Sequence, residues 1–136
     1  MKADRKIYAY DNGFISATYQ SVTSNDSRLL ENMVFVELVR RGFKPNFDLF
    51  YYQTRTGNEV DFFLRQGSKN LELIQVTQNL SALKTREREL RALHQASMEL
   101  NVSNLTIITM DTEESIKEKG VKIRVVPCIK WLSENK

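Results

Sequence analysis

Two short apolar segments joined by a polar loop constrain the fold of this chain more than any other part of its sequence. Residues 58–65 and 71–77 are rich in β-branched and aromatic side chains, and residues 66–70 between them are polar and include a glycine. This pattern predicts a β-hairpin with largely buried arms. Asp61 and Gln75 nevertheless lie within the apolar runs. Because a buried carboxylate is costly unless it is paired, hydrogen-bonded or metal-bound, these two positions need a specific role.

The sequence before the hairpin predicts a strand, one or two helical turns, a long helix and a second strand, at residues 5–10, 14–19, 26–41 and 48–54. Asp26 or Ser27 can cap the long helix at its start, and Gly42 suits its C-terminal cap. Glu37 is expected to pair with a nearby arginine. One face of this helix, at positions i, i+3, i+4 and i+7, combines an acid with three apolar residues, namely Glu31, Val34, Phe35 and Leu38.

After the hairpin the pattern predicts a helix, two strands and a terminal segment, at residues 81–100, 104–109, 121–126 and 127–136. The polar residues 111–119 are expected to form a connection with at most one or two helical turns. The helix takes the chain far enough for a crossover, so the next strand is expected to lie parallel to an earlier one. The buried side chains are expected to include Leu83, Leu90, Leu93 and Leu100 on the helix and Ile129, Trp131 and Leu132 in the terminal segment.

Strands flanked by helices in this order predict an α/β sandwich with a mixed central sheet. Its 136 residues fit one domain, spanning 1–136. No apolar run approaches the roughly 20 residues of a membrane span, and the first residues contain no hydrophobic signal segment, so a cytoplasmic protein is expected.

The composition limits the chemistry that this chain can perform. A single cysteine, Cys128, and a single histidine, His94, exclude a zinc site built from those residue types, so oxygen ligands and therefore magnesium, manganese or calcium are expected for any metal. The formal charge of +3 permits a polyanionic partner without requiring one. No G-x-x-x-x-G-K-[ST] motif occurs, so this chain contains no P-loop for ATP.

Four candidate residues follow one another along the chain. Glu31 lies in the first long helix, Asp61 in the first arm of the hairpin, and Gln75 and Thr77, two residues apart, in its second arm. This order resembles the restriction-endonuclease-like, PD-(D/E)XK nuclease superfamily, with core order αβββαβ. Over nearly the whole chain the sequence also resembles the C-terminal domain, of unknown function, of a prokaryotic AAA+ ATPase family. The matching stretches are 6–8, 11–13, 30–42, 59–62 and 74–76, then Thr85, Arg88 with Glu89, Pro127, Trp131 and Leu132.

The resemblance implies a site in which Glu31, Asp61 and Gln75 hold Mg²⁺ or Mn²⁺ for phosphodiester cleavage. The superfamily places a lysine where this chain has Thr77, which cannot supply a positive charge. Lys84, Arg86 and Arg88, early in the next helix, are the candidates to replace that charge or to contact nucleic acid. The partners implied are DNA, the ATPase domain of a larger parent protein and a second copy of the chain.

Each of these residues also has a structural interpretation. Glu31 and Asp61 can stabilise the fold through hydrogen bonds or an arginine, and Gln75 can be a buried amide that bonds backbone groups. The arginines can form a solvated helix face, and His94 a packing residue. The alternative function is therefore a protein-interaction or oligomerisation module without catalysis.

Overall fold

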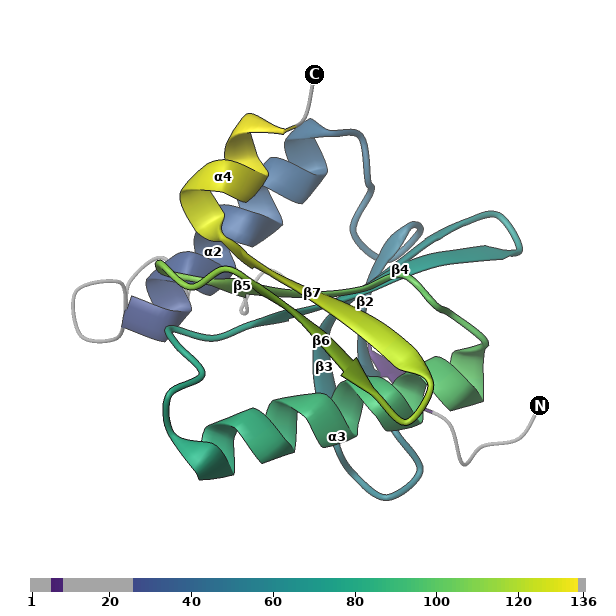
Figure 1. Cartoon of the computed structure of the whole chain (residues 1–136). Coiled ribbons are helices and arrows are strands. Elements are labelled where there is room, and N and C mark those ends of the chain that lie inside the picture. Colours follow the sequence, from purple (N-terminus) through teal and green to yellow (C-terminus); the bar gives the residue numbers. More distant parts are fainter. Residues whose placement is uncertain (1–5, 9–25, 135–136) are drawn as a thin grey trace.

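The computed structural model describes residues 6–8 and 26–134 (Figure 1). The helical turns expected at 14–19 lie outside the described residues. Within these two ranges, seven strands form one sheet in the order β1-β2-β3-β4-β5-β7-β6. The strands are β1 (Lys6–Tyr8), β2 (Leu49–Gln53), β3 (Glu59–Gln66), β4 (Lys69–Val76), β5 (Leu105–Thr109), β6 (Glu114–Glu118) and β7 (Val121–Pro127). The helices are α2 (Asp26–Arg40), α3 (Leu83–Leu100) and α4 (Cys128–Ser133).

The sheet is mixed, as the sequence predicts. Strands β1 to β4 form an antiparallel meander. Helix α3 then returns the chain so that β5 lies parallel to β4, and β7 lies parallel to β5. The expected crossover and the mixed α/β class are both confirmed.

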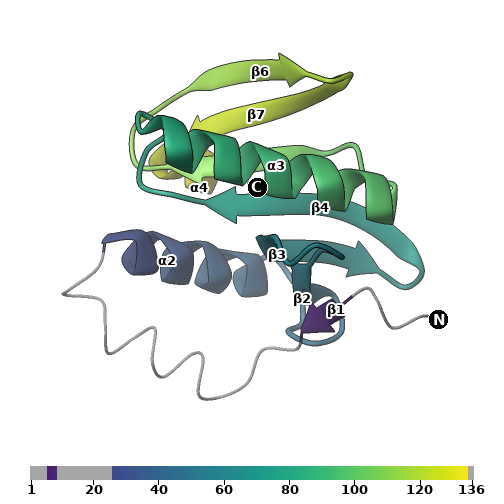
Figure 2. The same ribbon diagram turned by 90° about the horizontal axis from the view of Figure 1, so that it is seen from below.

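Helices cover both faces of the sheet, with α2 and α4 on one side and α3 on the other (Figure 1). Seen from the α3 side, this helix lies across β4, between the β6–β7 hairpin and β3 (Figure 2). Consecutive residues of a strand point to opposite faces, so Phe62 packs under α2 and α4 while Phe63 packs under α3. Both phenylalanines are fully buried, as is Tyr52, whose ring meets Phe63 edge to face.

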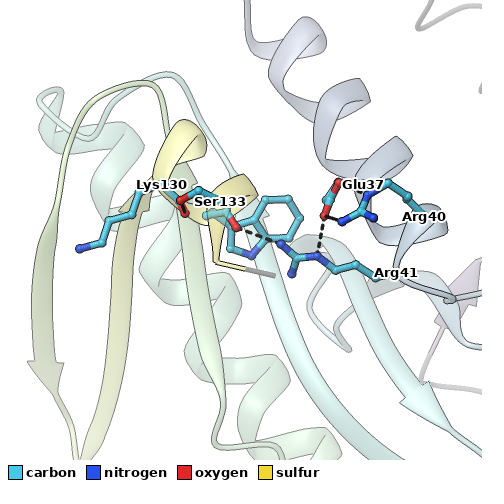
Figure 3. Close-up of polar contacts among 6 residues, drawn as sticks. Glu37, Arg40, Arg41, Lys130 and Ser133 are labelled. Atoms are coloured by element: carbon cyan, nitrogen blue, oxygen red, sulfur yellow. Dashed lines mark hydrogen bonds and ion pairs between the residues drawn. The ribbon is translucent and has the colours of Figure 1, made fainter. Parts of the chain in front are cut away.

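Helix α2 is fastened to α4 by a group of charged and aromatic side chains (Figure 3). The Glu37 carboxylate accepts hydrogen bonds from Arg40 Nε at 2.9 Å and from Arg41 Nε at 2.8 Å. Arg41 also donates to the Trp131 carbonyl oxygen at 2.9 Å, and its guanidinium lies 4.1 Å from the Trp131 ring centroid. The expected pairing of Glu37 is confirmed, and Arg41 joins the two helices.

Three expectations about the second half of the chain are wrong. Residues 114–118 are not a connection but the edge strand β6, joined to β7 by a tight turn in which Lys119 has φ 52° and Gly120 has φ 81°. Short, charged edge strands resist aberrant pairing, and β6 buries only Ile116. Leu83 and Ile129 are exposed because each lies in the first turn of its helix, outside the core. No helix in the described ranges is long and apolar enough to cross a membrane.

Candidate functional site

The candidate site lies where β3 and β4 separate. With one register shift between Leu64 and Arg65, the two strands pair from Gln66 and Lys69 up to Phe62 and Ile74. Beyond this pair, side chains replace the backbone ladder: Gln75 Oε1 accepts from the Asp61 N–H at 2.9 Å, and Gln75 Nε2 donates to the Glu59 carbonyl oxygen at 3.0 Å. In return, Asp61 Oδ2 accepts from the Val76 N–H at 2.8 Å. The two polar residues that the apolar runs could not explain therefore bind each other's strand.

Three carboxyl groups from three elements meet at this point. Asp61 of β3 is hydrogen-bonded to Glu31 of α2, and Glu89 of α3 is close enough for its charge to act on both acids. Burial, together with the negative charge of Glu31, raises the pKa of Asp61 well above its ordinary value. Burial likewise raises the pKa of Glu31 and of Glu89. Burial and the neighbouring acids thus both favour the protonated form of Asp61.

A hollow of about 390 Å³ adjoins the carboxyl groups. Asp61, Gln75 and Glu89 line it, and so does Arg88, which forms an ion pair with Glu89 at 3.3 Å. The hollow thus combines acidic groups with one arginine at its rim.

The other predicted site residues lie elsewhere. Thr77 is buried, and its hydroxyl donates to the Asn79 carbonyl oxygen at 3.4 Å. Arg86 binds both carboxylate oxygens of Glu114 on β6, at 3.0 and 3.1 Å. Lys84 is exposed in the first turn of α3. Of the three cations predicted near the site, only Arg88 lines the hollow.

Comparison with known proteins assigns the chain to a family. Residues 27–131 match the model of a domain of unknown function, DUF4143. The chain belongs to the DUF4143 family. A further match is the uncharacterized protein MJ1544 of Methanocaldococcus jannaschii, which is 41% identical over 117 residues, covering 82% of this chain. The matched region is 26% of that relative, so the chain spans about a quarter of its length. No solved structure matches this chain.

The side chains of the DUF4143 site include oxygen donors of the kind that bind hard cations. Glu31 and Asp61 offer adjacent carboxylate oxygens, which suit magnesium or manganese. Gln75, the third predicted ligand, uses its amide oxygen to accept from the Asp61 N–H. Within residues 6–8 and 26–134, no three His, Cys, Asp or Glu side chains form a group that could hold a metal. Glu31 and Asp61 are thus the two carboxylates among the three predicted ligands, and in the part of the chain that the structure describes they belong to no three-ligand metal group.

Sequence reasoning missed Glu89 as a member of this DUF4143 site. The missed signal is its place on the buried stripe of α3, which comprises Glu89, Ala92, Leu93, Ala96, Ser97 and Leu100. An acid at the start of such a stripe faces the sheet rather than the solvent. Its exposed fraction is 8%, whereas that of the neighbouring Arg88 side chain is 63%.

The raised pKa of Asp61 predicts how stability depends on pH. Its folded-state value lies above the unfolded value of about 3.9, so the free energy of unfolding should increase as the pH falls through the folded pKa towards about 4. The slope for one proton is about 1.4 kcal/mol per pH unit. Asp61→Asn keeps an acceptor for the Val76 N–H and should remove this contribution. Urea unfolding of both proteins across this pH range checks the prediction, which an unchanged profile in the variant would contradict.

Proposed function

We propose that this DUF4143 domain is a restriction-endonuclease-like accessory domain of a larger AAA+ ATPase, and that it contacts nucleic acid. One observation carries the proposal: Glu31, Asp61 and Gln75, from α2, β3 and β4, converge where β3 and β4 separate, beside a hollow. The resemblance of the sequence to nucleases implies a site built from these same three residues. The shared element order, one helix, three meander strands, a helix and a parallel strand, adds to this support.

The length of the Methanocaldococcus jannaschii relative supports a role for this domain within a larger protein. The region matched in the Methanocaldococcus jannaschii protein is about a quarter of its chain, which leaves room there for further domains. The sequence resemblance to the C-terminal part of an AAA+ ATPase suggests what such a domain is. Purifying this chain together with the ATPase part of a parent protein would test this arrangement, and failure of the two to associate would contradict docking between them.

Cleavage would require a positive charge that the position of Thr77 does not supply. A bound Mg²⁺ or Mn²⁺ would polarise a phosphate and lower the pKa of a bound water. The protein side of the site would supply Glu31 and Asp61 as ligands, while Thr77 supplies no positive charge. Arg88 is the described cation that lines the hollow, and it forms an ion pair with Glu89. We therefore propose nucleic-acid contact as the main role and treat cleavage as an activity to be measured.

Nicking of supercoiled plasmid measures that activity directly. The wild-type domain, Asp61→Asn and a chelator control are compared in magnesium and in manganese. We expect no nicking above the level of the variant. Metal-dependent nicking that disappears both in Asp61→Asn and with chelator would overturn the accessory role and make the domain a working nuclease.

Contact with nucleic acid is expected to involve Lys84 and Arg88. They lie one turn apart on α3, and both are exposed. Replacing both by alanine should reduce the slope of log affinity against log salt concentration by about 2, because each phosphate contact contributes about one. The charge-matched control replaces both Lys44, between α2 and β2, and Lys69, the first residue of β4, by alanine; both are exposed and lie outside α3. Fluorescence anisotropy with labelled DNA at several salt concentrations checks this, and equal slopes in the double variant and the control would contradict it.

One observation favours the alternative, a protein-interaction module. Val36 and Val39 lie one turn apart on the outer side of α2, with exposed fractions of 54% and 41%. Apolar side chains in such a position can dock a partner or a second copy. Light scattering of the wild type and of Val36→Lys tests self-association: a dimer that dissociates in the variant would support this alternative, and a monomer in both would remove the second copy.

A further inference from the structure

The exposed side of α3 forms the floor of a second hollow, of about 480 Å³. Glu87, Leu90, Arg91, His94 and Gln95 line it from the helix. The β2–β3 turn flanks the helix on one side and the tip of the β6–β7 hairpin on the other, as both overall views show (Figures 1 and 2). The turn contributes Thr56 and Asn58, and the hairpin contributes Glu118, Lys119, Val121 and Ile123. The hollow is therefore a trough with α3 along its bottom.

Hydrogen bonds hold the β2–β3 wall in place. Gln95 Oε1 on α3 accepts from Thr56 Oγ1 at 2.7 Å and from Asn58 Nδ2 at 2.8 Å. The Arg55 N–H donates to Glu99, one turn further along the helix, at 3.1 Å. This wall is thus formed before any ligand arrives, which lowers the entropy cost of binding.

The hairpin wall is fixed separately. The ion pair between Arg86 and Glu114 ties α3 to β6, and the tight turn at Lys119 and Gly120 sets the hairpin tip. The positive φ of Lys119 belongs to this turn. The lysine therefore occupies a defined position at the rim of the trough.

The trough offers cations that the fold does not use. Among the described residues, the side chains of Arg91 and Lys119 form no hydrogen bond or ion pair with one another or with the rest of the domain, and His94 lies beside them. Arg91 lies two turns after Lys84 on the exposed side of α3, which extends the line of positive charge along the helix. Two acids, Glu87 and Glu118, also line the trough, and the charge of Glu118 acts on Arg86. Arg91 and Lys119, which have no ion-pair partner in the described part of the chain, suit phosphate groups.

Apolar side chains lie in the trough and near the two ends of α3. Leu90 and Val121 are half-buried in the trough, and Leu83 and Met98, near the two ends of α3, have exposed fractions of 67% and 71%. A single strand presents unstacked base faces together with phosphates, whereas a duplex hides its base faces within the stack. A surface that mixes cations with apolar groups between two walls thus suits a single strand better than a duplex.

We propose that the α3 trough binds single-stranded nucleic acid, with phosphates on Arg91 and Lys119 and bases against Leu90 and Val121. The inference rests on the proposed nucleic-acid role and adds the form of the nucleic acid and the surface that holds it. The inference does not depend on the site formed by Glu31, Asp61 and Glu89, or on a metal bound there.

Anisotropy with a short fluorescein-labelled oligothymidylate, and with a labelled duplex of the same length, tests the proposal on the whole chain. The single strand should bind at least about tenfold more tightly than the duplex. Arg91→Ala and Lys119→Asn should each weaken single-strand binding about fivefold to tenfold, since each removes a phosphate contact while asparagine tolerates positive φ. Lys69→Ala is the charge-matched control, and circular dichroism confirms folding of each variant.

Glu87→Gln provides a test that loss of folding cannot mimic. Removing this acid from the trough floor should strengthen single-strand binding about twofold to fivefold. Equal or tighter binding of the duplex would overturn the inference and leave the proposed nucleic-acid role standing, whereas binding of neither probe would overturn both. Single-strand binding that none of the three trough variants changes would place the strand elsewhere and also overturn the inference.

Discussion

Replacing Gln75 by alanine is expected to lower the free energy of unfolding by about 3 kcal/mol, because the Glu59 carbonyl and the Asp61 N–H would both lose their hydrogen bonds at the point where β3 and β4 separate. Gln75 is 2% exposed, and its amide completes the contact between the two strands. Urea unfolding followed by circular dichroism measures the change. A metal ligand without a structural role would show almost no loss of stability in the absence of metal.

Two further variants define the cause of this loss. Gln66→Ala removes an exposed amide from the other end of β3 and should change stability by less than about 0.5 kcal/mol. Gln75→Glu keeps an acceptor for the Asp61 N–H but, when ionised, cannot donate to the Glu59 carbonyl and adds a charge beside Asp61 and Glu89. Its defect should therefore be large at neutral pH and smaller in acid. A defect that does not change with pH would argue against hydrogen bonding as the cause.

Removal of Glu37 is expected to cost about 2 kcal/mol. Its carboxylate joins Arg40 and Arg41, and Arg41 in turn holds Trp131 of α4, so Glu37→Ala would free the arginine that fastens the two helices. Hydrogen bonds to charged groups contribute about 1.5–3 kcal/mol, and the Glu37 residue is only 8% exposed. Thermal and urea unfolding measure the loss, with Glu113→Ala on the exposed surface as the matched control.

The same carboxylate predicts a pH dependence of opposite sign to that of Asp61. The hydrogen bonds from Arg40 and Arg41 lower the pKa of Glu37 to about 2, below the unfolded value of about 4.3. Its contribution to stability is therefore complete above about pH 4.3 and is lost as the pH falls towards about 2. The stability difference between the wild type and Glu37→Gln should shrink over that range. A difference that stays constant would show that the carboxylate charge contributes nothing.

Local patterns sufficed for most of the fold. Gly42 was expected to follow the long helix, and it has φ 106°, with its N–H bonded to the Val39 carbonyl. The arms of the hairpin were expected to be largely buried, and Phe62 and Phe63 in its first arm pack in separate cores. Strand β6 could not be found in this way because Ile116 is its one buried residue. Its pairing with β7 comes from the tight turn and from tertiary contact.

The sequence pointed to Glu31, Asp61 and Gln75 of the candidate site, but not to Glu89 or to the bonding among them. Asp61 and Gln75 stood out as polar residues in apolar runs, yet periodicity cannot show that each side chain binds the other's strand. Glu31 and Asp61 are thirty positions apart, and their hydrogen bond depends on how α2 packs at the open end of β3 and β4. Arg86 and Arg88 looked equivalent in the sequence, whereas the position of β6 gives Arg86 a partner in Glu114 and leaves Arg88 beside the hollow.

Cys128 is buried and is the single cysteine of the chain, so its reaction with a thiol reagent can report local opening of the domain around α4. It begins α4, three residues before Trp131, and is 2% exposed, and burial raises the pKa of its thiol. A thiol reagent can therefore react only when α4 lifts from α2 and the sheet. The rate of labelling under native conditions would measure the free energy of that opening without an added probe. Applied to Glu37→Ala, it would separate loosening of this corner from destabilisation of the whole domain.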